Sequence, residues 1–248
     1  MKRKADIIES AGFLLVKLGT LIVVASLFLI LGFIFVKGAS AISWEFLSQM
    51  PRSEMTAGGI FPAIVGTFYL MLGSSLISIP VGICTAIYLT EYAKNPRIVK
   101  VIRLGINNLA GVPSVVFGLF GLSLFVIFLG FGTSILAGSL TLGLLNLPVI
   151  IRSTEEALMV VPGTYREASL SLGATKWQTI YRVIVPNAMP GIMTGIMLSL
   201  GRAAGETAPI MFTAAAFFTP DLPVSVFNQV MALPYHIYVM ATAGTHIQ

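Results

Sequence analysis

The chain carries very little charge for its size. Of its 248 residues only 10% are Asp, Glu, Lys or Arg, whereas 56% are hydrophobic. Soluble domains usually contain about a quarter charged residues, so this chain has too little polar surface to cover a water-soluble globule. The composition therefore predicts a polytopic membrane protein.

Residues that commonly build disulfides, metal sites and nucleotide sites are also scarce. The single cysteine, Cys84, excludes an intrachain disulfide and a multi-cysteine metal site, and its apolar surroundings predict a small buried side chain. The two histidines, His236 and His246, are too few and too far apart to indicate a metal centre. Neither a glycine-rich nucleotide loop nor a basic run with interleaved aromatic residues is present, so we expect no bound cofactor and no nucleic-acid partner.

Long apolar segments predict the first two membrane spans. The segment 18–36 is free of charge over 19 residues, whereas the apolar core of a signal peptide has roughly 7–15. We interpret it as an uncleaved span, although residues 39–41 (Ala-Ser-Ala) resemble a cleavage site and leave a cleaved signal as the alternative. The segment 55–90 is also uncharged and is long enough for one long helix.

The second half of the chain predicts three further spans. The segment 104–151 is uncharged for 48 residues, which suits two spans separated by a turn at Gly130–Ser134. A fifth span lies within 183–220. We expect 91–103 to be a polar connection and most of 222–248 to lie outside the membrane.

The distribution of basic residues orients these five spans. With the N-terminus inside, 12 of the 15 Lys and Arg residues lie on the inner side. Only Lys37 and Arg52 fall outside, and Arg202 lies within an apolar segment. Because inner loops of membrane proteins carry the excess of positive charge, the N-terminus is predicted to be cytoplasmic. The connection at 152–182 is then cytoplasmic too.

That connection is a polar island between apolar segments, with the sequence RSTEEALMVVPGTYREASLSLGATKWQTIYR. Thr164 and Glu167 have the spacing of a capping box, which predicts a helix through Leu172 that Gly173 ends. A second short helix is expected from Lys176 to a limit at Pro186. Two short helices joined at a glycine form a compact docking element, although a solvated loop without a partner fits the pattern equally well.

A charged pair interrupts the last apolar segment. Arg202 and Glu206 are four residues apart, and in a helix they share one face. A charge in the bilayer centre costs about 2.5–3.5 kcal/mol on insertion scales, so a structural salt bridge is one explanation. The functional explanation is that Arg202 offers its guanidinium to an oxyanion and Glu206 orients it. A third is that Arg202 pairs with an acidic residue of a second membrane subunit.

The spacing within the polar island resembles a known family. The pattern consists of Glu167-Ala168-Ser169, three residues, Gly173, nine residues and then 183–186 (Val-Ile-Val-Pro). It is similar to the EAA loop of ABC importer permeases, from which it departs at Ser169, Val183 and Val185. In that family the loop forms coupling helices that seat in a groove of a cytoplasmic ATPase. The resemblance implies that Glu167, Ala168 and Gly173 face this ATPase, with Ser169 and Pro186 completing the motif.

Other segments narrow the resemblance to the phosphate-specific permeases of that family. Residues 111–118 and 201–212 resemble the branch as a whole, and 58–67 and 232–236 resemble one of its two subunits. The resemblance implies an all-α, type I ABC importer fold with a permease domain at 58–248, after an N-terminal segment at 1–57, and a coupling loop at 152–186. It also implies a sixth span, which the sequence up to Gln248 does not reveal.

The resemblance further implies how such a chain works. Phosphate would pass Arg202, Glu206 and Thr207, while a separate ATPase dimer uses ATP and Mg²⁺. A second permease subunit, an extracytoplasmic phosphate-binding protein and membrane lipid are the other expected partners. The alternatives are an importer for another oxyanion such as sulfate or molybdate, and a channel or secondary carrier that needs no ATPase. A membrane-embedded enzyme is disfavoured, because Arg202 and Glu206 alone supply too few reactive groups.

Overall fold

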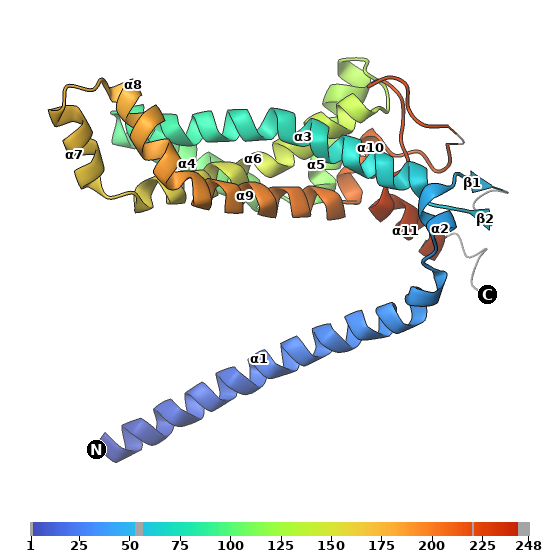
Figure 1. Ribbon diagram of the computed structural model, residues 1–248, viewed down its shortest axis with the longest axis horizontal. Coiled ribbons are helices and arrows are strands. Elements are labelled where there is room, and N and C mark those ends of the chain that lie inside the picture. The colour runs from blue at the N-terminus through green and yellow to red at the C-terminus, as the bar shows by residue number, and fades with distance from the viewer. Residues whose placement is uncertain (1, 53–56, 220, 243–248) are drawn as a thin grey trace. The chain divides into compact units, whose positions relative to one another are not determined.

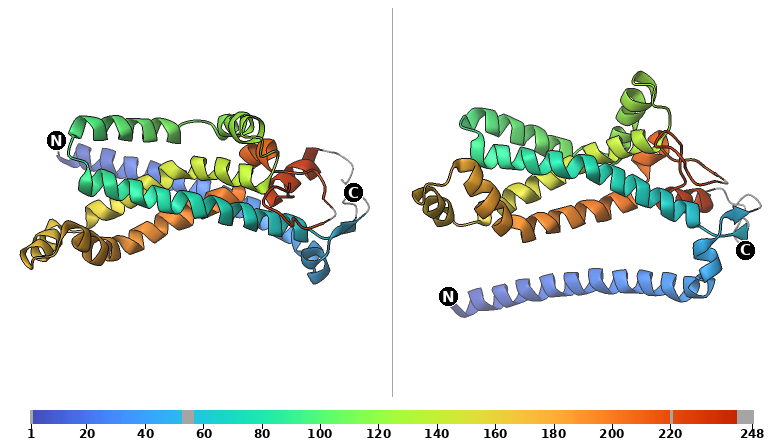
Figure 2. Two further views of the ribbon diagram at one scale, coloured as in Figure 1. Left: turned by 90° about the horizontal axis from the view of Figure 1, so that it is seen from above. Right: turned by 45° about the horizontal axis from the view of Figure 1, so that its top comes forward.

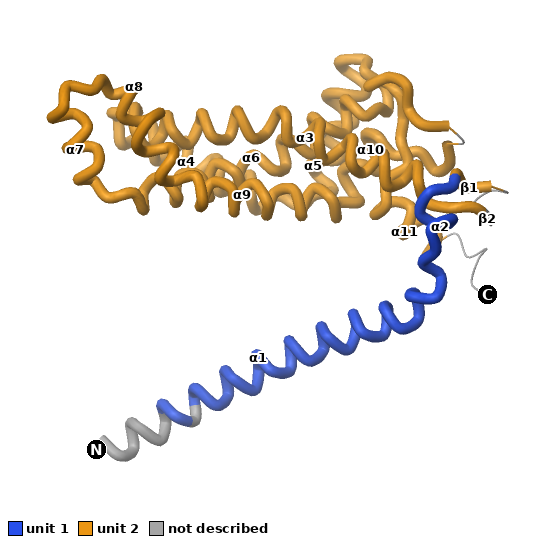
Figure 3. The backbone as a smooth tube through the Cα atoms, viewed as in Figure 1, with its two compact units in different colours: residues 1–49 blue, residues 50–248 orange. Residues whose placement is uncertain are grey.

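The computed structural model describes residues 2–52, 57–219 and 221–242. They divide into two compact units, residues 1–49 and residues 50–248 (Figure 3). The expected boundary between 57 and 58 stays a prediction.

The first unit is dominated by one long helix. Helix α1 runs from Lys2 to Gly38, and a short 3-10 turn, η1, follows at Ala39–Ala41. The apolar stretch Gly12–Ala41 has 30 residues and is long enough to cross a bilayer. Helix α2 (Trp44–Ser48) ends the unit, and the Ser43 hydroxyl caps it by accepting the Phe46 N–H at 3.1 Å.

The second unit is a helical bundle built on three long helices. A two-stranded antiparallel sheet, β1 (Pro51–Arg52) with β2 (Ala57–Gly58), precedes α3 (Phe61–Ile87). Helix α6 (Ile135–Val160) and helix α9 (Val185–Gly205) run beside α3 along the long axis of the bundle (Figures 1 and 2). Shorter elements fill the two ends and one side: η2 (Tyr88–Tyr92), α4 (Pro96–Ala110), α5 (Ser114–Gly121), η3 (Leu122–Phe128), α7 (Gly163–Ser171), α8 (Lys176–Thr179), η4 (Ile180–Ile184), α10 (Ala208–Thr213) and α11 (Leu233–Thr242).

The three long helices approach closely because small residues lie where they meet. A Cβ atom added to Gly195 of α9 would lie 2.5 Å from the Ser153 Cβ of α6, and one added to Gly82 of α3 would lie 2.6 Å from Ile150. Small residues at contacts between membrane helices let the backbones pack tightly. Two apolar clusters result. One joins α3, α5, α6 and α10, and the other joins α3, α6 and α9 toward the end that carries α7.

Within the described residues, four helices are long and apolar enough to cross a membrane. A fifth span results if α4 and α5–η3, which are bent by 98° at their junction, count as one broken crossing. The expected turn at Gly130–Ser134 is confirmed, because Gly130 and Gly132 adopt positive φ angles of 70° and 65° between η3 and α6. The prediction of an all-α multi-pass protein is thereby confirmed.

Three local predictions were wrong. The segment 91–103 is not merely a connection, because α4 starts at Pro96 with the Asn95 side chain as its cap. Cys84 is exposed rather than buried. Pro186 lies inside a continuous helical segment that runs from Lys176 to Gly205. The C-terminal part holds α11, a helix of 10 residues, and residues 243–248 lie outside the described part, so the extramembrane position expected for most of 222–248 stays a prediction.

Candidate functional site

The polar island forms a hairpin of short helices at one end of the bundle (Figure 1). Helix α7 starts at Gly163 after Pro162, and no side chain caps it, so the expected capping box of Thr164 and Glu167 is absent. The box occurs one helix later. There the Thr175 hydroxyl accepts the Gln178 N–H at 3.3 Å, and the Gln178 side chain accepts the Thr175 N–H at 2.8 Å.

Most residues of the EAA-like motif face away from the bundle. Glu167, Ala168 and Gly173 are exposed, and Gly173 ends α7 with a φ of 83°. Ser169 instead points inward, where its hydroxyl hydrogen-bonds the Thr179 hydroxyl at 2.9 Å and joins α7 to α8. Pro186 is exposed in the first turn of α9. The motif thus has an exposed face, and one internal hydrogen bond, through Ser169, holds α7 to α8.

Large apolar side chains surround this outward face, and sequence reasoning did not single them out. Leu172 is 89% exposed and Trp177 is 62% exposed. Trp177 stacks on Tyr181, with ring centroids 6.2 Å apart and an angle of 11° between the rings. Exposed aromatic and leucine side chains beside a polar motif are typical of a protein-binding surface. The sequence did contain one signal for this surface, because these apolar side chains occur in a loop that is otherwise polar and charged.

Arg166 fastens α7 to the membrane helices. Its Nε and Nη2 atoms donate to the carboxylate of Glu91 in η2, which continues α3, at 3.0 and 2.7 Å. The same guanidinium donates to the carbonyl oxygens of Leu158 and Val161 at the end of α6, at 3.1 and 2.9 Å. Arg166 therefore links α7, α3 and α6 through four hydrogen bonds. We call this contact the Arg166 clamp.

A second cation strengthens the same junction. The Lys176 ammonium donates to the Glu91 carbonyl oxygen and lies 4.9 Å from the centroid of the Tyr92 ring. Residues from both ends of the hairpin, α7 and α8, thus contact the end of α3. Glu91 and Arg166 are 75 positions apart, so no local sequence pattern could have indicated the contact.

The Arg202–Glu206 pair lies at the opposite end of α9 from α8. Arg202 is in the last turn, and Glu206 is the first residue after the helix, with extended backbone. The Arg202 Nε donates to the Glu206 carboxylate at 3.1 Å, so the expected salt bridge is present. Thr207 follows and precedes α10, whose Met211 N–H donates to the Thr207 carbonyl oxygen at 3.0 Å. The three predicted pathway residues are therefore adjacent at a helix break.

The pair leaves the guanidinium accessible. The Arg202 side chain remains 37% exposed, and its two terminal amino groups donate to no acceptor within the described residues. Gly201 and Gly205 have no atom within 4 Å of where a Cβ would lie, so open space flanks the pair. The salt bridge can thus orient Arg202 without consuming its capacity to bind an oxyanion bidentately.

Helix geometry also locates the pair along the bundle. From Arg182 to Arg202 the chain rises at most about 30 Å, at 1.5 Å per residue. The hydrocarbon core of a bilayer is also about 30 Å thick. If Arg182 marks one membrane boundary, Arg202 lies near the other rather than at the midplane.

Reactive clusters are absent from the described part of the chain. Across 2–52, 57–219 and 221–242, no group of three or more His, Cys, Asp or Glu side chains could hold a metal ion. The polar residues that converge are instead basic and acidic side chains engaged in pairs.

Comparison with known proteins gives a consistent assignment. Residues 78–242 match the family described as "Binding-protein-dependent transport system inner membrane component". The probable ABC transporter permease protein YqgI of Bacillus subtilis is 36% identical over 90% of this chain and 80% of its own length. The phosphate transport system permease protein PstA 1 of Mycobacterium tuberculosis is 43% identical over 78% of this chain and 63% of its own. This chain therefore spans less than two thirds of that mycobacterial relative.

Among solved structures, an inward-facing form of the MetNI methionine ABC transporter matches part of this chain. It is 24% identical and superimposes with a TM-score of 0.49, over 58% of this chain and 68% of the other.

Proposed function

This chain belongs to the binding-protein-dependent transport system inner membrane components, the permeases of ABC importers, and we propose that it is the permease subunit through which such an importer moves inorganic phosphate into the cell. The observation that carries the importer assignment is the outward face of Glu167, Ala168 and Gly173 on a hairpin clamped to the membrane helices. The cargo assignment is supported by relatives that are named phosphate transport permeases and by the accessible Arg202 guanidinium.

The partners follow from this assignment. Family membership implies an ATPase and a substrate-binding protein in general. We propose specifically a PstC-like second permease subunit, a cytoplasmic PstB-like ABC ATPase dimer and an extracytoplasmic PstS-like phosphate-binding protein. The chain itself would bind no cofactor, since ATP and Mg²⁺ belong to the ATPase. It would lie in the cell membrane of a bacterium or archaeon, surrounded by lipid, with its N-terminus and the 152–186 loop in the cytoplasm.

The geometry suggests how ATP could drive transport. Closure of the ATPase dimer would displace the hairpin through the exposed residues Glu167, Leu172 and Trp177. The Arg166 clamp would carry this displacement to α3 and α6, and the continuous segment from Lys176 to Gly205 would carry it to Arg202. Two conformational states of the bundle would then differ in which side of the membrane the phosphate can reach.

The role of Arg202 can be tested by its replacement with glutamine in the assembled transporter. Arg202→Gln should abolish phosphate uptake, because the neutral side chain loses the charge and the paired donors that hold an oxyanion. Arg202→Lys should restore uptake only in part, since an ammonium keeps the charge without the planar fork. Assembly with the ATPase should be unchanged in both. Normal uptake by Arg202→Gln would show that the residue has no role in phosphate passage.

The role of the loop can be tested by reversing the charge of Glu167. Glu167→Arg should reduce both co-purification of the ATPase and uptake, because a cation replaces the carboxylate on the docking face. Glu156→Arg is the matched control, since Glu156 is an exposed carboxylate on α6 outside the motif. Equal behaviour of the two variants would contradict the docking role.

A large excess of sulfate or molybdate should leave uptake of labelled phosphate unchanged, and competition would instead indicate a broader oxyanion importer.

A further inference from the structure

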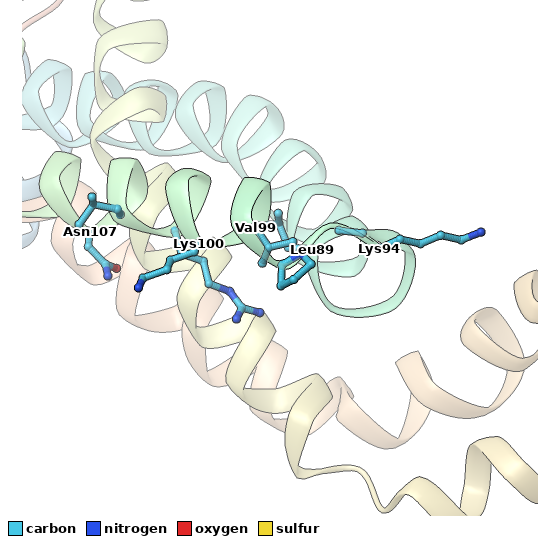
Figure 4. A pocket seen from close by; sticks show the side chains of 9 residues that line it. Leu89, Lys94, Val99, Lys100 and Asn107 are labelled. Atoms are coloured by element: carbon cyan, nitrogen blue, oxygen red, sulfur yellow. The ribbon is translucent and has the colours of Figure 1, made fainter.

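A groove of about 530 Å³ runs along one face of α4, close to the end of α3 (Figure 4). Its cationic lining comes from Lys94, Lys100 and Arg103, and Asn107 adds an amide. Lys100, Arg103 and Asn107 of α4 are three and four residues apart, so they follow one stripe of the helix. Apolar side chains such as Leu89 and Val99 complete the lining. We call this feature the α4 groove.

Arg103 is held in place by a buried carboxylate. Its Nε donates to the Glu155 carboxylate of α6 at 3.1 Å, and the Glu155 side chain is only 2% exposed. The two terminal amino groups of Arg103 donate to no acceptor in the described part of the chain, and the side chain is 37% exposed. A guanidinium fixed through Nε and free at its terminal nitrogens is oriented to bind a second anion.

The groove keeps an excess of positive charge. Neither Lys94 nor Lys100 forms an ion pair or a side-chain hydrogen bond with any described residue. Glu155 neutralises one of the three cations, which leaves an excess of two positive charges in the lining; Lys100 is the nearer of the two lysines to Asn107, and the Lys94 side chain points away from both (Figure 4). An exposed tetrahedral anion suits such a set, because it accepts several charge-assisted hydrogen bonds at once.

The position of the groove relates it to the hairpin. Lys94 follows η2, which carries the Glu91 that Arg166 binds, so the groove opens at the end of the bundle where α7 and α8 lie. Arg202 lies at the other end of α9. A need for positive charge on the inner side of a membrane accounts for basic residues here, but it does not account for a groove or for an arginine held by a buried carboxylate.

We propose that the α4 groove is a second binding site for a phosphate-type oxyanion, with Lys100 and Arg103 as its principal donors. The proposal rests on the proposed function only for the placement of the groove on the cytoplasmic side. Two anions on the cytoplasmic side have this phosphate-type chemistry. One is inorganic phosphate on its way out of the permease, and the other is the phosphodiester headgroup of an anionic lipid. The first would give the transporter a release site distinct from Arg202.

Lys100→Gln is the informative variant, because the exposed side chain has no protein partner to lose. Arg97→Gln is the matched control. Arg97 lies one helical turn before Lys100 and carries the same charge, but it does not line the groove. A third variant, Arg103→Gln with Glu155→Gln, removes both charges of the pair together and so leaves no unpaired buried carboxylate.

The first measurement is equilibrium binding of labelled inorganic phosphate to the nucleotide-free complex of permease subunits and ATPase, in phosphatidylcholine nanodiscs without the binding protein. Lys100→Gln should weaken binding about tenfold, the effect of one charge-assisted hydrogen bond, and the double variant should do the same. Arg97→Gln should leave the affinity unchanged. This result identifies inorganic phosphate as the occupant.

The second measurement is native mass spectrometry of the same complexes after incubation with phosphatidylglycerol. If Lys100→Gln and the double variant lose bound phosphatidylglycerol while Arg97→Gln keeps it, the headgroup is the occupant and the oxyanion site stands. Equal behaviour of Lys100→Gln and Arg97→Gln in both measurements overturns the proposal. That failure is distinct from failure of the proposed function, which would appear as absence of phosphate uptake by the unmodified transporter.

Discussion

Replacing Arg166 with glutamine would remove the charged half of the clamp that joins α7 to α3 and α6. The guanidinium donates four hydrogen bonds, two to the Glu91 carboxylate and two to main-chain carbonyl oxygens. A glutamine amide has two donor hydrogens and a shorter reach, so it can satisfy at most part of this set. Glu91 would also lose the cation that balances its charge.

The burial of the pair sets the size of the effect. Arg166 and Glu91 side chains are 27% and 10% exposed, so the pair lies between a surface pair and a fully buried one. Exposed pairs contribute about 0.2–1 kcal/mol, and breaking a buried pair costs about 3–5 kcal/mol. An intermediate loss of about 2 kcal/mol would raise the fraction of time that α7 is detached by about 30-fold.

Hydrogen exchange on the assembled transporter measures this detachment directly. The amide protons of α7 should exchange about 30-fold faster in Arg166→Gln, while those in the middle of α6 should be unchanged. ATP hydrolysis should continue, with fewer phosphate ions transported for each ATP. Arg152→Gln is the control, because Arg152 is an exposed cation on α6 with no side-chain hydrogen bond in the described residues.

A double-mutant cycle with Glu91→Gln separates the charge pair from the rest of the clamp. If the pair is responsible, Arg166→Gln and Glu91→Gln together should cost little more than either alone. Unchanged α7 exchange and an unchanged ratio of transport to hydrolysis in Arg166→Gln would refute the reasoning. The hairpin would then be held by other contacts, such as the hydrogen bond between Ser169 and Thr179.

Three further outcomes are expected. Gly195→Ala should lower the stability of the bundle by about 1–3 kcal/mol in denaturant or thermal melts, because the new methyl group meets Ser153, whereas Gly201→Ala should be tolerated since no atom lies nearby. Gly173→Ala should destabilise the end of α7 by about 1–2 kcal/mol, because alanine resists the positive φ, and faster exchange of the 168–173 amides would reveal it. Trp177→Ala should weaken ATPase co-purification without changing the melting temperature, because the ring is exposed; an unchanged yield of complex would exclude it from the docking face.

Properties that depend on composition and on local pattern were predictable from the sequence. Uncharged segments predicted the long helices, since only apolar residues can fill a bilayer span. The glycines at 130 and 132 predicted a turn that requires positive φ. The EAA-like spacing predicted a partner-facing loop; Glu167 and Gly173 are exposed, and their contact with a partner stays a prediction. The roles of Arg202, Glu206 and Thr207 stay predictions.

The sequence rules for helix starts and ends failed where the neighbouring helices decided which of two matching patterns was used. Two Thr-x-x-Glu/Gln patterns, at Thr164 and Thr175, fit a capping box, but α7 already begins at Gly163, so only the second Thr stands before a helix. Pro186 does not end the helix because the wide π-helical turn η4 directly precedes it and leaves room where an α-helical turn would clash with the ring.

Long-range contacts could not be predicted from the sequence at all. The Arg166 clamp joins residues 75 positions apart, and the pair of Arg103 with Glu155 joins residues 52 positions apart. Both depend on which faces of α3, α4 and α6 meet, and periodicity alone does not determine this. The bend of 98° between α4 and α5 is likewise set by tertiary packing, although Gly111 and Pro113 mark its place.

The helical segment from Lys176 to Gly205 is uninterrupted, so it connects the hairpin directly to the Arg202 end of α9. Its 30 residues extend about 45 Å, so a tilt of about 5° at the hairpin would move the far end by about 4 Å. That displacement exceeds the length of a hydrogen bond, which is about 3 Å. A small rotation imposed on the hairpin would therefore move the Arg202 end of the segment far enough to make or break a hydrogen bond there.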